Sequence, residues 1–147
     1  MTTQRSTGRF MPSSWDETVV VDIDGTGTDK NGVYYPDRGV TRALVEYRYT
    51  GDIDGTSTAA YVFAYRDGKA GHARINGYER FEGSIGGHEG TCVFVHTGVV
   101  EDGLVSGHVE VAEGLGTGGL EDLSGSADLV LENPTDDGYE LTLAYDL

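Results

Sequence analysis

The fold class is decided by residues 56–82, TSTAAYVFAYRDGKAGHARINGYERFE. Two runs rich in aromatic, β-branched and small apolar residues flank a polar segment that contains Asp67-Gly68. Aromatic and β-branched residues favour strands, and Asp-Gly adopts the positive φ angles of tight hairpin turns at low cost. This stretch therefore predicts two antiparallel strands, 56–66 and 72–82, joined by a short connection.

The same alternation of strand-like runs and glycine turns continues along the whole chain. Glycine makes up 23 of the 147 residues, and we find almost no helical periodicity. The further predicted strands are 9–15, 18–23, 40–50, 90–100, 104–113, 126–131 and 139–146. This spacing predicts a single all-β domain, a sandwich or a barrel, over residues 1–147. Residues 1–8 are expected to be a disordered N-terminus, and residues 21–39 an acidic, glycine-rich excursion.

Charge excludes several function classes. Asp and Glu number 25 against 10 Lys and Arg, so the net charge is −15. A protein of this charge is repelled by nucleic acid and by anionic membranes, and no apolar run approaches the ~18 residues of a membrane helix. Cys92 is the single cysteine and has no partner for an intrachain disulfide. We therefore expect a cytoplasmic protein with neither nucleic-acid nor membrane partners.

Three known site motifs match short segments of this chain, but the surrounding sequence excludes each site. DIDGT at 22–26 matches the start of a haloacid-dehalogenase phosphatase, but no alternating β/α pattern follows, and the motif recurs at 52–56 in a predicted hairpin. As calcium loops, both copies place an apolar residue, Val33 or Phe63, where an EF-hand requires glutamate. GLGTGG at 114–119 has the glycines of a dinucleotide loop without a long helix behind them. We predict no cofactor.

The four histidines show no zinc-binding spacing. His96 and His108 approach each other only if their strands form a hairpin, so no metal site is predicted. Cys92 shares a strand face with His96 but lies at no helix N-terminus that would activate its thiol. We interpret Cys92 as a small buried side chain rather than a nucleophile.

Strand parity places two polar side chains, Glu79 and His96, on apolar faces. Glu79 shares its face with Ile75, Gly77 and Phe81, and His96 shares its face with Cys92, Phe94 and Gly98. A third apolar face, on the preceding strand, consists of Ala59, Tyr61, Phe63 and Tyr65. Glu79 is either an acid/base group in an apolar environment or the partner of an arginine such as Arg42 or Arg48. His96 is either a hydrogen-bonded core residue or a ligand-binding or proton-transfer group.

A series of segments along the chain resembles a bacterial family catalogued as domain of unknown function 3224. These segments are Trp15-Asp16-Glu17, residues 49–55 (YTGDIDG), Ala64-Tyr65-Arg66, residues 77–87 (GYERFEGSIGG), His96-Thr97-Gly98, and the glycine-rich stretch 116–125. The family is grouped with the allene oxide cyclase-like barrels, so the resemblance implies an eight-stranded antiparallel barrel. Related barrels bind hydrophobic small molecules, and some close rings in reactive substrates. Cys92 departs from the family's larger apolar residue, which would enlarge a cavity.

Three functions remain open at this point. The first is a non-catalytic carrier of a hydrophobic small molecule; the second is a cofactor-independent isomerase or cyclase acting on an apolar natural-product or lipid-derived substrate; the third is a filled structural barrel. For the second, Glu79 and His96 are the predicted catalytic residues. The predicted ligand-binding residues are Tyr49, Tyr61, Phe63, Tyr65, Cys92 and Phe94.

Two features of the barrel would separate these functions. A cavity on the barrel axis of at least roughly 300 Å³, the lower limit of ordinary ligand sites, is required by both pocket functions. The run Ala60, Val62 and Ala64 forms an apolar second face on its strand. If this face points outward it needs a cover, which favours a homodimer.

Overall fold

Strands account for most of the chain in the computed structural model, which describes residues 3–30, 32–102, 104–131 and 138–147. These ranges contain no helix, and therefore none that is long and apolar enough to cross a membrane. The strands are β1 (Gln4–Asp22), β2 (Gly27–Lys30), β3 (Val33–Pro36), β4 (Gly39–Gly51), β5 (Ile53–Asp67), β6 (His72–Ile85), β7 (His88–Glu101), β8 (Leu104–Val111), β9 (Thr117–Gly118), β10 (Ser124–Leu131) and β11 (Tyr139–Asp146).

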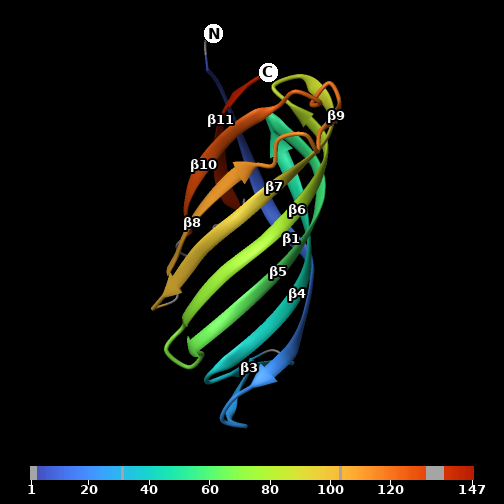
Figure 1. Ribbon diagram of the computed structural model, residues 1–147. Coiled ribbons are helices and arrows are strands. Elements are labelled where there is room, and N and C mark those ends of the chain that lie inside the picture. Colours follow the sequence, from blue (N-terminus) through green and yellow to red (C-terminus); the bar gives the residue numbers. More distant parts are fainter. Residues whose placement is uncertain (1–2, 31, 103, 132–137) are drawn as a thin grey trace.

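Eight of these strands close into a ring, which confirms the all-β antiparallel fold (Figure 1). The order around the ring is β1, β4, β5, β6, β7, β8, β10 and β11, with each neighbouring pair antiparallel. Closure depends on β1, because Gln4–Phe10 pair with β11 while Gly8–Asp22 pair with β4. Beyond Phe10, the strand pairing of β1 among the described residues is with β4 alone.

Alternation along the strands separates a buried inner face from an exposed outer face. On β5 the side chains of Ala59, Tyr61 and Phe63 are buried in the ring, whereas those of Ala60 and Val62 are exposed. The apolar second face of Ala60, Val62 and Ala64 therefore points outward. Within this chain, the described residues leave the outer face of β5 open to solvent.

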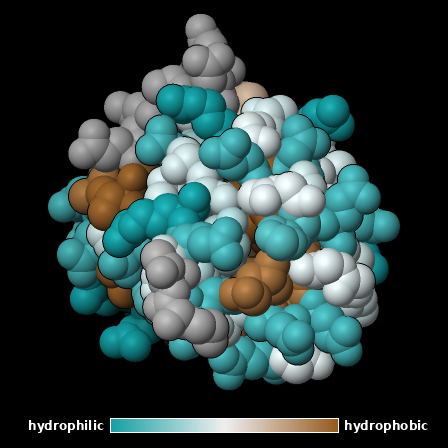
Figure 2. Space-filling model, turned by 90° about the horizontal axis from the view of Figure 1, so that it is seen from above, coloured by the Kyte–Doolittle hydropathy of each residue, from teal (hydrophilic) through white to brown (hydrophobic). Residues whose placement is uncertain are grey.

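One end of the ring is filled and capped. Phe81, Phe94 and Leu143 are fully buried there, and the segment between β8 and β10 adds the buried side chains of Leu120 and Leu123. This segment contains turns and the short strand β9 but no helix, so its glycine motif lacks the element that a dinucleotide site requires. Figure 1 shows β9 and both chain ends at this end of the molecule. Figure 2 views the end from above and shows a mainly hydrophilic surface with small separate hydrophobic patches.

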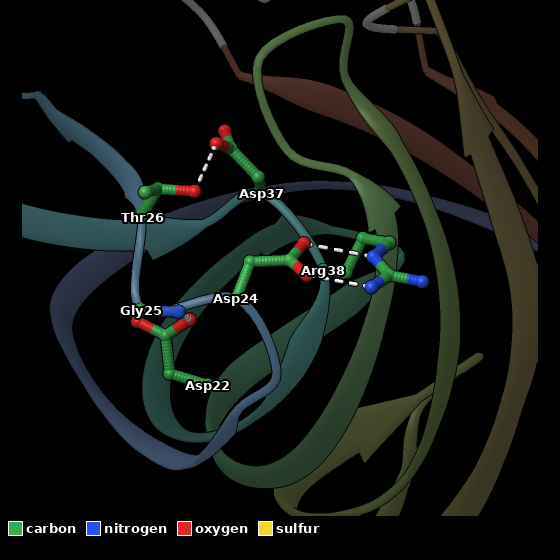
Figure 3. Close-up of polar contacts among 6 residues, drawn as sticks. All are labelled: Asp22, Asp24, Gly25, Thr26, Asp37 and Arg38. Atoms are coloured by element: carbon green, nitrogen blue, oxygen red, sulfur yellow. Dashed lines mark hydrogen bonds and ion pairs between the residues drawn. The ribbon is translucent and has the colours of Figure 1, made fainter.

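The predicted excursion is a small hairpin of β2 and β3 at the opposite end (Figure 1). Its carboxylates are used in internal hydrogen bonds. Asp24 accepts from Nε and an Nη of Arg38 at 2.8 and 2.6 Å, and Asp22 accepts from the backbone N–H of Gly25 (Figure 3). Asp22 also accepts from the hydroxyl of Tyr34. The Arg38 guanidinium lowers the pKa of Asp24. The first DIDGT motif is thus a turn held by its own side chains, and not a phosphatase site.

Three strand boundaries differ from the sequence analysis. Residues 4–8, expected to be disordered, are paired with β11, because the first residues supply the strand that closes the ring. The two predicted strands 9–15 and 18–23 form one strand, β1, which contains irregularities in its pairing with β4 near Pro12 and Val19. The second DIDGT motif lies largely inside β5, since the hairpin turn is at Gly51-Asp52 rather than at Asp54-Gly55.

We predict that Gly77→Ala destabilises the fold by about 1–3 kcal/mol, the cost of overpacking a tight site. An added Cβ at Gly77 would lie 2.5 Å from the carbonyl oxygen of Ala60 and 2.6 Å from Cδ1 of Tyr61. Gly107→Ala is the matched control, because its Cβ would come no closer than 3.2 Å to any atom. Urea unfolding of both variants measures the difference, and equal stabilities would contradict the close packing at Gly77.

Candidate functional site

A pocket of about 180 Å³ occupies the half of the ring away from the filled end. All eight strands of the ring contribute to its wall. The lining residues are Phe10, Pro12, Trp15, Tyr47, Tyr61, Phe63, Ile75, His96, Thr97, Gly98, Val105, Gly107, His108, Leu129, Leu131 and Tyr139. Pro12 and Trp15 are exposed, so the pocket reaches the molecular surface on the side of β1.

Two paired glycines create part of this space. In the register of β6, β7, β8 and β10, Ile75 lies opposite Gly98, Gly98 opposite Gly107, and Gly107 opposite Leu129. All four positions face inward, and at the two glycines the wall consists of backbone alone. Larger residues at these positions would fill the pocket, as the side chains of Phe81 and Phe94 fill the other end.

The wall is mainly aromatic and aliphatic. The Trp15 ring stacks on Phe63 with a centroid distance of 6.0 Å and an interplanar angle of 5°. The hydroxyl groups of Tyr47 and Tyr61 share a hydrogen bond of 2.9 Å. None of the described lining residues is Lys, Arg, Asp or Glu, so the pocket favours an uncharged, largely apolar molecule.

Glu79 lies behind this wall, fully buried, and accepts three hydrogen bonds. Oε2 accepts from the hydroxyl groups of Tyr49 and Ser57, each at 2.5 Å, and Oε1 lies 2.6 Å from Nε2 of His96. Three donors around two carboxylate oxygens satisfy the ionised form of a buried acid. The predicted alternative of an arginine partner is wrong, because Arg42 and Arg48 lie on the exposed outer face of β4.

His96 connects Glu79 to the pocket. Its side chain is 13% exposed and lines the pocket, and its ring meets that of Tyr61 edge to face at 5.3 Å between centroids. Because Nε2 is directed to Glu79, the neutral imidazole that donates there has an unprotonated Nδ1. Among the residues that the structure describes, no protein group hydrogen-bonds to this Nδ1. The pair therefore has the arrangement of a base oriented by a carboxylate.

The predicted site residues divide into three groups. Tyr61, Phe63 and His96 line the pocket. Glu79 and Tyr49 lie behind it in the hydrogen-bonded cluster. Cys92, Phe94 and Tyr65 do not line it.

Strand parity predicts the face of a residue but not its height along the barrel axis, and for this reason the prediction that Cys92, Phe94 and Tyr65 line the pocket is wrong. Cys92 and Phe94 belong to the filled end. Tyr65 lies towards the β2–β3 hairpin, where its hydroxyl donates to Glu17 at 2.7 Å. Burial raises the pKa of the Cys92 thiol to about 12, which agrees with its interpretation as an inert side chain.

The sequence analysis missed much of the wall, including Phe10, Trp15, Tyr47 and Leu129. These residues could be predicted by combining two kinds of information: which residues of each strand face inward, and which residues of neighbouring antiparallel strands lie opposite each other. Phe10 pairs with Tyr49, and Tyr47 lies two residues from Tyr49 on the same face. Without the register, these residues could not be assigned to one end of the barrel.

No group of His, Cys, Asp and Glu within the described ranges has the arrangement of a metal site. His96 and His108 belong to one hairpin, as expected, but His96 pairs with Val109 and His108 with Thr97. The two imidazoles also have separate partners, since Nδ1 of His108 contacts Asp128 at 3.0 Å.

A family model described as "Protein of unknown function (DUF3224)" matches residues 6–143. The chain belongs to this family. The match agrees with the resemblance seen in the sequence, and the grouping with allene oxide cyclase-like barrels remains a prediction. No curated protein matches the chain.

A crystal structure of a protein with unknown function from the DUF3224 family, from Shewanella oneidensis MR-1, is similar to this DUF3224 protein. The identity is 18% and the TM-score 0.72, over 99% of this chain and 98% of the other. At this identity the likeness shows a shared fold alone.

We predict that the buried tyrosines of this DUF3224 protein ionise only as the protein unfolds at alkaline pH. Burial, followed by the charge of Glu79, raises the pKa of Tyr49, and burial with the neighbouring Tyr47 and Glu79 raises that of Tyr61. A raised pKa in the folded state means that the stabilisation is fully present below the unfolded-state pKa of about 10 and is lost as the pH rises above it.

Absorbance of tyrosinate and circular dichroism, followed through an alkaline titration, test this. We expect an early step from the exposed tyrosines and a late step that coincides with loss of β structure. Tyr61→Phe should reduce the late step only. Ionisation of all nine tyrosines in a folded protein would contradict the buried cluster.

Proposed function

We propose that this protein binds a compact, uncharged, mainly apolar small molecule with a single ring in the pocket inside the ring of strands. The observation that carries the proposal is an aromatic pocket with the His96 imidazole, oriented by the buried Glu79, in its wall. Ligand sites in proteins combine apolar walls with a few placed polar groups in this way. The ligand therefore carries one polar group that meets His96.

The volume of the pocket sets the size of this ligand. The pocket of about 180 Å³ does not reach the roughly 300 Å³ expected of both pocket functions, so the requirement for a ligand site of ordinary size is not met. A polyketide- or lipid-sized ligand does not fit inside the barrel, so the proposed ligand is limited to a smaller molecule. An apolar cavity of about 150 Å³ binds benzene. A molecule with one aromatic or alicyclic ring fits the pocket, with substituents directed towards the opening beside Trp15.

The second candidate function is proton transfer on such a molecule, and the Glu79–His96 pair favours it. Nδ1 of His96 would take a proton from the bound molecule, and the Glu79 carboxylate would stabilise the resulting imidazolium. Tyr49 and Ser57 would hold the carboxylate in place through their hydrogen bonds. This is the chemistry of an isomerase that needs no cofactor.

Phenol and toluene are probes for the binding role, because they match in size and differ in one hydroxyl group. We expect both to bind, phenol more tightly because its hydroxyl donates to His96, and Trp15 fluorescence to report both. Trp15 is the single tryptophan of the chain and lines the pocket.

Gly107→Val directs two methyl groups into the pocket and should weaken binding of both probes at least about tenfold. Ser106→Val is the matched control, since Ser106 is its exposed neighbour on the outer face of β8. If neither probe binds the wild type, or if both variants bind equally, the proposal fails and the filled structural barrel is favoured. Circular dichroism of both variants confirms that they fold.

5-Nitrobenzisoxazole tests the second candidate, because a positioned base converts it without any co-reactant. It has a second ring fused to the first, so its nitro-substituted ring must extend towards the opening beside Trp15. The base takes the ring C–H proton, that electron pair forms the nitrile, and the N–O bond breaks to release a coloured phenolate. We expect the wild type to exceed His96→Gln by about 10²-fold or more, the usual contribution of a general base. Equal rates in the two proteins would contradict proton transfer by His96, and they would not affect the proposal that the pocket binds a ligand.

A further inference from the structure

The outer face of β4, β5 and β6 presents an exposed apolar row. Leu44 of β4 lies opposite Ala60 of β5, and Ala60 lies opposite Tyr78 of β6. Leu44 is 57% exposed and Tyr78 61%, and Val62, one row away, is 48% exposed. The surface beside the row is hollowed between Leu44, Ala60 and Val62. We refer to this surface as the β4–β6 face.

Charges surround this row in a regular arrangement. On β4, Arg42 and Glu46 are exposed and lie two residues before and two residues after Leu44. On β6, Arg74 and Glu82 are exposed and lie four residues before and four residues after Tyr78. Between them, β5 presents only the uncharged outward residues Thr56, Thr58, Ala60, Val62 and Ala64. On each flanking strand, a positive and a negative side chain are therefore equidistant from the row. Arg48 of β4 and Arg80 of β6 add two exposed positive charges, and the positions related to them across the row, Val40 and Asn76, are uncharged.

This spacing is self-complementary under a two-fold rotation. Consider a second copy of the chain placed face to face, with the rotation axis lying along the row Leu44–Ala60–Tyr78. The rotation keeps each strand opposite its own copy and reverses its direction, so Arg42 meets Glu46 of the second copy. In the same way Arg74 meets Glu82, and the apolar row packs against itself.

We propose that two copies of this protein form a symmetric dimer through the β4–β6 face. The same patch on both subunits is the usual geometry of a homodimer. The face carries both signs of charge, and each Arg–Glu pair across the axis joins opposite charges, which suits a second copy. The interface lies on the outside of strands whose inner faces line the pocket, so dimer formation leaves the proposed binding site intact.

The partners of the arginines distinguish this axis from the other two-fold axis that the face permits. An axis running along β5 would place Glu46 against Arg80 and Arg48 against Glu82, and Arg80 and Glu82 already contact each other at 3.5 Å within the chain. It would leave Arg42 and Arg74 uncompensated. In the described part of the chain, Arg42, Arg48 and Arg74 have no ion pair. The axis along the row gives one to Arg42 and to Arg74, whereas the axis along β5 gives one to Arg48 alone.

The contact ends at β4. Asp16 of β1 continues the row beyond Leu44 and is exposed. Two copies of this carboxylate on the axis would repel each other, and the curvature of the ring carries β1 away from the partner. The interface is thus limited to three strands, whose outward side chains carry both signs of charge.

Charge reversal on β4 tests the proposal by analytical ultracentrifugation over a concentration series. The wild type should be a dimer. Arg42→Glu places two carboxylates opposite each other, and Glu46→Arg places two guanidinium groups opposite each other, so each should weaken the dimer at least about tenfold. The double variant Arg42→Glu with Glu46→Arg restores both pairs and should restore the dimer.

Mixing the two single variants provides the sharpest result. In the mixed dimer, Glu at position 42 of one chain meets Arg at position 46 of the other, and Glu46 meets Arg42, so the mixture should dimerise although neither variant does so alone. A monomeric wild type, or single variants that remain dimeric, would overturn the proposal. Failure of the double variant and of the mixture, with the single variants monomeric, would overturn the axis. Phenol binding by the monomeric variants should match that of the wild type, which separates this test from that of the pocket.

Discussion

The pairing of β1 with two partners is the constraint on which the rest of the structure depends. Gln4–Phe10 bond to β11 and Gly8–Asp22 bond to β4, so the first strand of the chain joins the last and closes the ring. Closure gives every strand of the ring a fixed neighbour on each side over at least part of its length. It therefore fixes which side chains enter the interior, because each pair of antiparallel residues shares a face.

The interior divides according to the size of the inward residues. Where Phe81, Phe94 and Leu143 point inward, the ring is full. Where Gly98 and Gly107 do so, a pocket opens. Glu79 lies between the two regions and satisfies its buried carboxylate with Tyr49, Ser57 and His96. A buried acid without these donors would be costly, so the cluster supports the fold as well as orienting the imidazole.

The sequence predicts the fold class and much of the inward face well. Alternation in residues 59–65 and 75–81 and the Gly86-Gly87 turn, where both glycines have positive φ, are local signals, and the structure agrees with them. The height of a residue along the barrel is not a local property. It depends on the stagger between strands, which is why Tyr61 and Phe63 line the pocket while Tyr65, on the same face, lies outside it. The partner of Glu79 was missed for the same reason, because Tyr49 and Ser57 meet it across strands.

Among the described residues, the part of β1 beyond Phe10 has β4 as its one strand neighbour. An unpaired strand edge is a template on which another chain can add a strand, and such edges lead to aggregation. This edge carries Pro12, which has no N–H to offer, two irregularities in its pairing, and the carboxylates of Asp16 and Glu17. Each of these interrupts the flat, uncharged ladder that an incoming strand requires. The acidic composition of the chain thus acts locally as well, by protecting a long edge of β1 that ring closure leaves open.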